Sequence, residues 1–137
     1  MVGRTDVPEP AIARLRAICR ALPDAYEEPA WVGVRWRVRG RTFAHALVIE
    51  EGRPQAYARA AGTDGPACVV TFRVTGEELA ALEHAGSPYF AVRWGRDVGG
   101  AALDEFDDWD QLAELLTESY CALAPEKLAR MVERPDP

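Results

Sequence analysis

The sequence lacks any long apolar run. A helix that crosses a bilayer needs about 20 consecutive apolar residues, and no stretch of this chain approaches that length. The residues after Met1 also lack the apolar segment of a secretory signal. These two absences lead us to expect a cytoplasmic protein that has no membrane partner.

Cysteine is scarce and scattered. The chain has three cysteines, Cys19, Cys68 and Cys121, and no two of them form a Cys-x-x-Cys pair. An odd number of distant cysteines favours neither a disulfide framework nor a zinc site. Free cysteine is among the most buried residue types, so we expect reduced thiols in the core.

Recognisable catalytic motifs are missing as well. The two histidines, His45 and His84, have no serine or cysteine partner in a known pattern. The chain also contains no Gly-x-Ser-x-Gly elbow, no phosphate-binding glycine loop and no His-Glu-x-x-His. We therefore expect a protein that is not an enzyme and that holds no cofactor.

A group of carboxylates in the last third of the chain is a candidate metal site. It consists of Asp104, Glu105, Asp107, Asp108 and Asp110. Clustered carboxylates can hold hard cations, but this group lacks the spacing of a calcium loop. A helix N-cap and the helix dipole explain Asp107, Asp108 and Asp110 without a metal. We favour that structural interpretation and expect no metal.

The stretch from Trp31 to Val48 predicts a β-hairpin. Its side chains alternate with the period of a strand, with Val34, Trp36 and Val38 on one face and Arg35, Arg37 and Arg39 on the other. Gly40 permits a tight turn, after which Arg41 begins the returning strand. The hairpin is therefore expected to have an apolar face and an arginine face.

The other elements follow from local signals. Helices are expected from Pro8 to Ala21, from Thr75 to Gly86, from Trp109 to Leu123 after an Asp107 or Asp108 N-cap, and from Glu126 to Val132. Strands are expected at 67–74 and 98–104, with a weak third strand at 55–61, a short extended piece at 91–94, and connectors at 22–29 and 87–90. This order predicts one α+β domain over residues 1–137, an antiparallel sheet with helices packed on one face and the other face open.

Charge is unevenly distributed. The net charge is −6, yet residues 31–60 hold six arginines against two glutamates, whereas residues 101–137 hold three basic against ten acidic groups. Local potential steers association more than net charge does. The arginines of the basic segment are candidates for nucleic-acid binding: Arg35, Arg37, Arg39, Arg41, Arg53 and Arg59. The alternative is that they keep an exposed sheet soluble and block edge pairing.

Three stretches together resemble the MmcQ/YjbR family of small bacterial proteins. They are residues 22–28, residues 36–44, and Asp108-Trp109-Asp110 with Leu112, Leu115, Leu116, Ser119 and Tyr120. The resemblance covers roughly residues 10 to 132, which we take as the domain core. It implies a two-layer sandwich similar to that of the frataxin homologue CyaY and DNA binding through a double-wing arrangement. Within this pattern Ser119 is interpreted as a small packing residue.

Two functions from different classes follow. Same-side residues of a strand lie about 6.5–7 Å apart, near the spacing of phosphates, so an arginine row is suited to DNA binding without sequence preference. An exposed tryptophan or tyrosine beside the row would favour single strands, but Trp36 faces the core side. The alternative is a protein-interaction module or a homodimerising adaptor. The two differ in salt response, which is steep for DNA.

Overall fold

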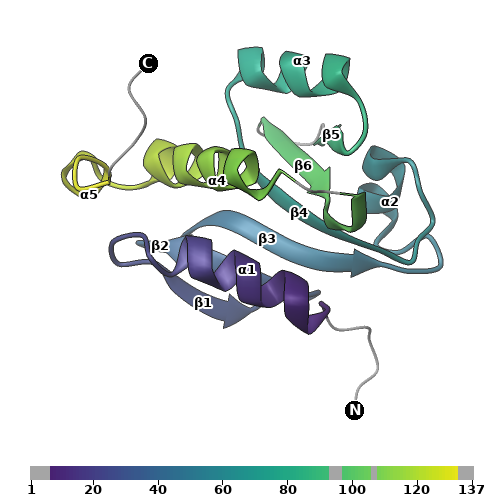
Figure 1. Ribbon diagram of the computed structural model, residues 1–137, viewed down its shortest axis with the longest axis horizontal. Coiled ribbons are helices and arrows are strands. Elements are labelled where there is room, and N and C mark those ends of the chain that lie inside the picture. Colours follow the sequence, from purple (N-terminus) through teal and green to yellow (C-terminus); the bar gives the residue numbers. More distant parts are fainter. Residues whose placement is uncertain (1–6, 93–96, 106–107, 133–137) are drawn as a thin grey trace.

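The computed structural model describes residues 7–92, 97–105 and 108–132. The helices are α1 (Glu9–Cys19), α2 (Gln55–Ala61), α3 (Gly76–Ala85), α4 (Trp109–Leu123) and α5 (Glu126–Ala129), with a 3-10 turn η1 (Leu103–Glu105). The strands are β1 (Tyr26–Pro29), β2 (Val34–Val38), β3 (Arg41–Ile49), β4 (Ala67–Arg73), β5 (Tyr89–Val92) and β6 (Val98–Ala102). They form one antiparallel sheet in the order β1-β2-β3-β4-β6-β5, which confirms the α+β class (Figure 1).

One face of the sheet, the inner face, is covered by α1, α3 and α4. Its strands contribute Trp36, Val38, Val70 and Phe72, all of them buried. The helices bury Ile12 and Leu15 of α1, Leu79 and Leu82 of α3, and Leu112, Leu116 and Tyr120 of α4 against these strands. The apolar side chains of α4 thus pack on the sheet, as their helical period indicates.

The opposite, outer face is only partly open, which corrects the expectation of helices on a single face. Arg35, His45 and Thr71 lie on it in register across β2, β3 and β4. At its far end α2 buries Ala58 over Leu47 and over neighbouring apolar residues of β4 and β5. The exposed part of the outer face is therefore the region of β1, β2 and the adjoining halves of β3 and β4.

The expected third strand at 55–61 is wrong, because this segment is the helix α2. Alanine supplies four of its seven residues, and alanine favours helix and is depleted in strands. Gly62 ends the helix with a left-handed φ of 72°, a conformation that glycine adopts without a steric penalty. The alanine-rich composition of this segment thus favours a helix, although turn residues lie on both sides of it.

The connector expected at 22–29 contains a strand, β1. Tyr26 to Pro29 pair antiparallel with β2, and Glu28 lies directly opposite Arg35. Four residues that include two glutamates and a proline give a weak strand signal, yet a proline is tolerated on an edge strand. The sheet therefore begins one strand earlier than the sequence pattern indicates.

Several element boundaries differ from those expected. β5 runs from Tyr89 to Val92 and so spans parts of the predicted 87–90 connector and 91–94 extended piece. α5 ends at Ala129 rather than Val132. The Thr75 capping box and the Asp108 N-cap are both present. Trp94 and the alternative N-cap Asp107 lie outside the described residues.

The expected hairpin is confirmed, but its turn takes one arginine off the strand. Val38 pairs with Arg41, so Arg39 and Gly40 are the two turn residues, with φ values of 49° and 80°. Positive φ at both central positions is the geometry of a tight hairpin turn. Arg39 consequently does not continue the row of Arg35 and Arg37.

Glycine in β6 reflects close packing rather than weakness of the strand. A Cβ atom on Gly100 would lie 2.3 Å from the ring of Phe90, the residue opposite it on β5. The Phe90 ring occupies the space that a side chain would need, so the strand depends on this glycine.

Ser119 of α4 bridges two strands of the sheet and is not merely a small packing residue. A register shift in the β2–β3 pairing leaves Phe43 as an extra residue, and β3 and β4 stop pairing at Ala44 and Phe72. The Ser119 hydroxyl donates to the Phe43 carbonyl at 2.6 Å and accepts from the Arg73 N–H at 2.8 Å. The hydroxyl therefore satisfies two backbone groups that the ladder no longer joins.

The Ser119→Ala variant is expected to lower the free energy of unfolding by about 1–3 kcal/mol, because it leaves buried backbone groups without a partner. Urea denaturation followed by circular dichroism measures this change. Glu114→Ala, an exposed position of the same helix, serves as control and should stay within about 0.5 kcal/mol of the wild type. Equal midpoints for the two variants would show that the bridge contributes nothing.

Candidate nucleic-acid interface

Arg35 and Arg37 both lie on the outer face, as the sequence predicts, but they share a carboxylate. Arg35 Nε donates to Glu28 Oε1 at 2.7 Å, and Arg37 Nη1 donates to the same oxygen at 3.1 Å. Although desolvation opposes it, these hydrogen bonds lower the pKa of Glu28. The side chains of Arg35 and Arg37 are 37% and 24% exposed. The pair is thus accessible, held in place, and carries one surplus positive charge.

Arg39 and Arg41 lie at the hairpin turn. Arg39 Nη2 pairs with Asp24 Oδ2 at 2.9 Å, and both side chains are more than half exposed. Arg41 is exposed and makes no ion pair with any described residue. Solvent screening makes an exposed pair such as Arg39 and Asp24 weak, so both arginines can turn toward a ligand.

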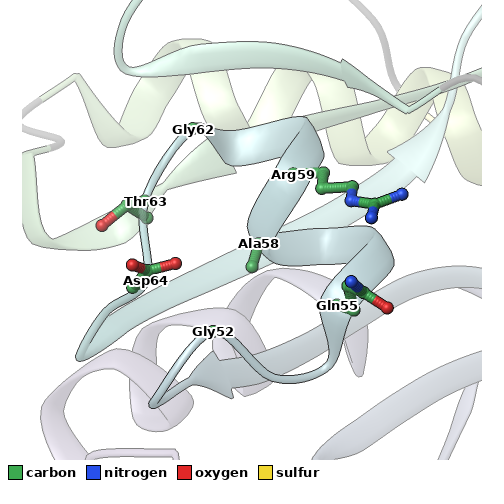
Figure 2. A pocket seen from close by; sticks show the side chains of 7 residues that line it. All are labelled: Gly52, Gln55, Ala58, Arg59, Gly62, Thr63 and Asp64. Carbon is green, nitrogen blue, oxygen red and sulfur yellow. The ribbon is translucent and has the colours of Figure 1, made fainter.

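Arg53 and Arg59 lie elsewhere and do not join this surface. Arg53 follows the far end of β3, and nine residues at a rise of about 3.4 Å place the two ends of that strand about 27 Å apart. Arg59 lines a hollow of about 320 Å³ beside α2. Figure 2 shows Arg59 and Gln55 on one side of this helix, with Thr63 and Asp64 on the loop at its other side. The polar groups of this hollow do not converge.

The segment before the hairpin supplies acids that sequence reasoning did not connect to the arginines. Glu27 accepts from Arg16 Nε at 2.9 Å and Nη2 at 2.8 Å, and from the Trp36 indole at 3.0 Å. The hydrogen bond from Arg16 is the main cause that lowers the pKa of Glu27. Asp24 and Glu28 also pair with arginines, so each acid of this segment has an arginine partner. Recognition of β1 as a strand would have placed Glu28 opposite Arg35.

Two exposed aromatic residues flank the arginine pair and were not among the predicted site residues. Tyr26 is 41% exposed and pairs with Arg37 across β1 and β2, so it shares the outer face. Trp31 is 88% exposed in the loop that joins the same strands. Gly33 in this loop has a φ of 78°, and a Cβ there would lie 2.0 Å from the Ala46 carbonyl oxygen. The loop therefore packs directly against β3.

His45 is fixed on the outer face next to Arg35. Its Nε2 lies 2.6 Å from the Val32 carbonyl and its Nδ1 lies 3.3 Å from the Tyr57 hydroxyl. A carbonyl can only accept, so Nε2 carries the proton and Nδ1 accepts from Tyr57. Burial lowers the pKa of His45, and the nearby charge of Arg35 lowers it further. The ring is therefore neutral at pH 7 and held from both sides.

Two members of the acidic group that was considered as a metal site have structural roles. Asp104 accepts from the backbone N–H of Cys68 at 2.8 Å, and Asp108 caps α4 through the N–H of Gln111. Within residues 7–92, 97–105 and 108–132, no cluster of three or more potential ligands is present.

Burial raises the pKa of the Cys68 thiol to about 12, which makes it a poor nucleophile.

The part of the chain that the structure describes contains no helix with the length and apolarity that a membrane span requires.

Comparison with known proteins identifies relatives of the sequence and of the fold. The family model described as YjbR matches residues 20–122. The crystal structure of Deinococcus radiodurans protein DR2400, with a DUF419 domain, is similar at a TM-score of 0.63 and 19% identity, covering 91% of this chain and 89% of that chain. At this identity the likeness concerns the fold. No curated protein matches the sequence.

The Glu27→Gln variant is expected to be less stable than the wild type at pH 7. The lowered pKa means that the glutamate stabilises the fold above its ordinary pKa of about 4.3 and that this stabilisation is lost as the pH falls further. The difference in urea midpoint should therefore shrink between pH 5 and more acidic buffers. Glu114→Gln on α4 is the control. A constant difference at every pH would mean that the charge of Glu27 is irrelevant to stability.

Proposed function

The chain belongs to the YjbR family, and on this premise we propose that it binds DNA through the exposed part of its outer face, largely without sequence preference. The observation that carries the proposal is the grouping of Arg35, Arg37 and Tyr26 on one two-stranded surface. The DNA-binding, double-wing description that accompanies the family resemblance supports the choice of ligand. We propose binding rather than catalysis, and a cytoplasmic location.

The charge of this part of the molecule suits a polyanion despite the acidic chain. On the outer face and its hairpin turn, four arginines (Arg35, Arg37, Arg39 and Arg41) lie beside two acids, Glu28 and Asp24, whereas the whole protein has a net charge of −6. Arginine binds phosphate oxygens in a planar, bidentate geometry. Because Glu28 and Asp24 offset part of the charge, the proposed contact involves few net charges. We expect a modest salt dependence rather than the steep one of a strongly basic protein.

The exposed aromatic residues favour single strands over duplex. Bases of a single strand can stack on tyrosine and tryptophan, and each stacked base contributes about 1–3 kcal/mol. Tyr26 lies beside Arg37, and Trp31 lies at the opposite end of β2 from the hairpin turn. A strand that follows the arginines would meet one aromatic ring on the way and a second at the end. A duplex offers no free base to either ring.

A protein partner is the alternative function, and one observation favours it. β1 is an edge strand of the sheet, and an edge strand can pair with a strand from another chain. A packed protein interface would depend far less on salt than a phosphate contact does. Binding measurements at several salt concentrations therefore separate the two functions.

The Arg41→Ala variant is expected to bind labelled oligothymidylate more weakly and with a smaller salt slope. With about two net phosphate contacts, wild-type affinity for a single strand should fall about sevenfold between 50 and 200 mM salt, and loss of one contact should reduce the log–log slope by about 0.7. Fluorescence anisotropy over a salt series measures both quantities.

Arg53→Ala is the matched control, since Arg53 is an exposed arginine beyond the other end of β3. It should leave affinity and slope unchanged. Equal losses for both variants would place the contact elsewhere. If no DNA binds even at low salt, the DNA-binding function is wrong and the protein partner takes its place.

The Tyr26→Ala and Trp31→Ala variants are expected to lose affinity for single strands by about fivefold or more each, with little effect on duplex, because a stacked base contributes at least about 1 kcal/mol. Anisotropy titrations with single-stranded and duplex oligonucleotides of equal length provide the comparison. Met131→Ala removes an exposed apolar side chain elsewhere on the surface and should change neither affinity. Parallel losses for both DNA forms would contradict stacking on these rings.

A further inference from the structure

A small hollow opens on the outer face where α2 leaves the sheet uncovered. It has a volume of about 150 Å³. Side chains from α2 and three strands line it, among them Thr42, His45, Tyr57, Thr71, Arg73 and Val98. His45 is the neighbour of Arg35 across β2 and β3, so the hollow adjoins the arginine pair. A ligand that lies along Arg35 can therefore reach it.

We propose that this hollow receives one pyrimidine base of a DNA strand bound on the outer face. The inference rests on the proposed function and adds to it a specific base site. A cavity of about 150 Å³ is large enough for one six-membered ring, as the binding of benzene in engineered cavities of that size shows. The fused rings of a purine need more room. The hollow is open to solvent on one side, so its size favours a pyrimidine over a purine without enclosing it.

The walls of the hollow are rigid and aromatic on one side. The rings of His45 and Tyr57 meet edge to face, with centroids 5.8 Å apart and planes at 81°. Both nitrogens of His45 are occupied by Val32 and Tyr57, so the imidazole is not available to coordinate a ligand. Its role is to fix the wall against which a base would pack.

Unused hydroxyls supply the polar contacts that a base requires. Thr71 is only 6% exposed, and neither its hydroxyl nor that of Thr42 has a hydrogen-bond partner among the described residues. Both hydroxyls reach the open space of the hollow, because Arg37 Nε is the only fully buried side-chain polar atom without a hydrogen-bond partner among the described residues. A hydroxyl can donate or accept, so it can match the carbonyl, amine or imine groups of either pyrimidine. The site would therefore accept thymine and cytosine alike.

The test compares two labelled oligomers of equal length, one of thymidine and one of abasic deoxyribose phosphate. Both present the same phosphates, and only the first presents bases. The wild type should bind the thymidine oligomer about five- to 150-fold more tightly, the range expected for a base held by stacking. A deoxyadenosine oligomer should gain less, because the purine does not enter the hollow.

The Thr71→Val variant keeps the shape of the side chain and removes its hydroxyl. It should bind the thymidine oligomer about fivefold more weakly, equivalent to one hydrogen bond of about 1 kcal/mol, and the abasic oligomer as well as before. Thr63→Val, at the separate hollow of Figure 2, is the control and should change neither affinity. Circular dichroism of each variant confirms that it is folded.

Three outcomes would overturn the inference and are distinguishable. If the thymidine and abasic oligomers bind equally, the base site is wrong although DNA binding stands. If the preference for bases survives Thr71→Val but disappears in Tyr26→Ala, the base stacks on the exposed rings and not in the hollow. If neither oligomer binds, the proposed function fails and the base site fails with it.

Discussion

The contact between α4 and the middle of the sheet is the constraint on which the rest of the structure depends. At the irregularity in β3, the Ser119 hydroxyl replaces the missing hydrogen bond between β3 and β4. The next residue, Tyr120, packs its ring edge to face on Phe43 and donates to the Pro23 carbonyl at 2.7 Å. One turn of helix thus joins the sheet to the segment that leads into β1. The positions of the edge strands and their arginines follow from this attachment.

The arginines of the outer face are paired with carboxylates and do not form a bare cationic row. Asp24, Glu27 and Glu28 each pair with at least one arginine, and the less exposed pairs of Glu27 with Arg16 and of Glu28 with Arg35 and Arg37 orient the side chains at the edge of the sheet. Such pairing lowers the net charge available to a polyanion and limits non-specific attraction. It also orients the guanidinium groups of Arg35 and Arg37.

Much of the fold could be predicted from the sequence, because the signals were periodic and local. Alternation defined the hairpin, and the spacing of Leu112, Leu116 and Tyr120 defined the packed face of α4. The alanine-rich α2 and the short β1 were not predicted. A segment of so few residues carries little periodicity, and contacts with neighbouring strands decide its secondary structure. The placement of the candidate site residues was predicted in part. Arg35 and Arg37 face outward as expected, while their shared partner Glu28 depends on a register that no local pattern specifies.

The Gly33 loop, which packs tightly on β3, presents Trp31 beside the arginines, and the two kinds of side chain respond differently to salt. Trp31 lies two residues before Gly33 in this loop and is 88% exposed, so its ring is open to an unpaired base. Stacking is insensitive to ionic strength, whereas the arginine contacts are screened. If the surface binds DNA as proposed, a rise in salt therefore shifts the balance of recognition from the phosphate chain to the bases. The same surface would hold any polyanion in dilute buffer and would discriminate for unpaired bases in a concentrated one.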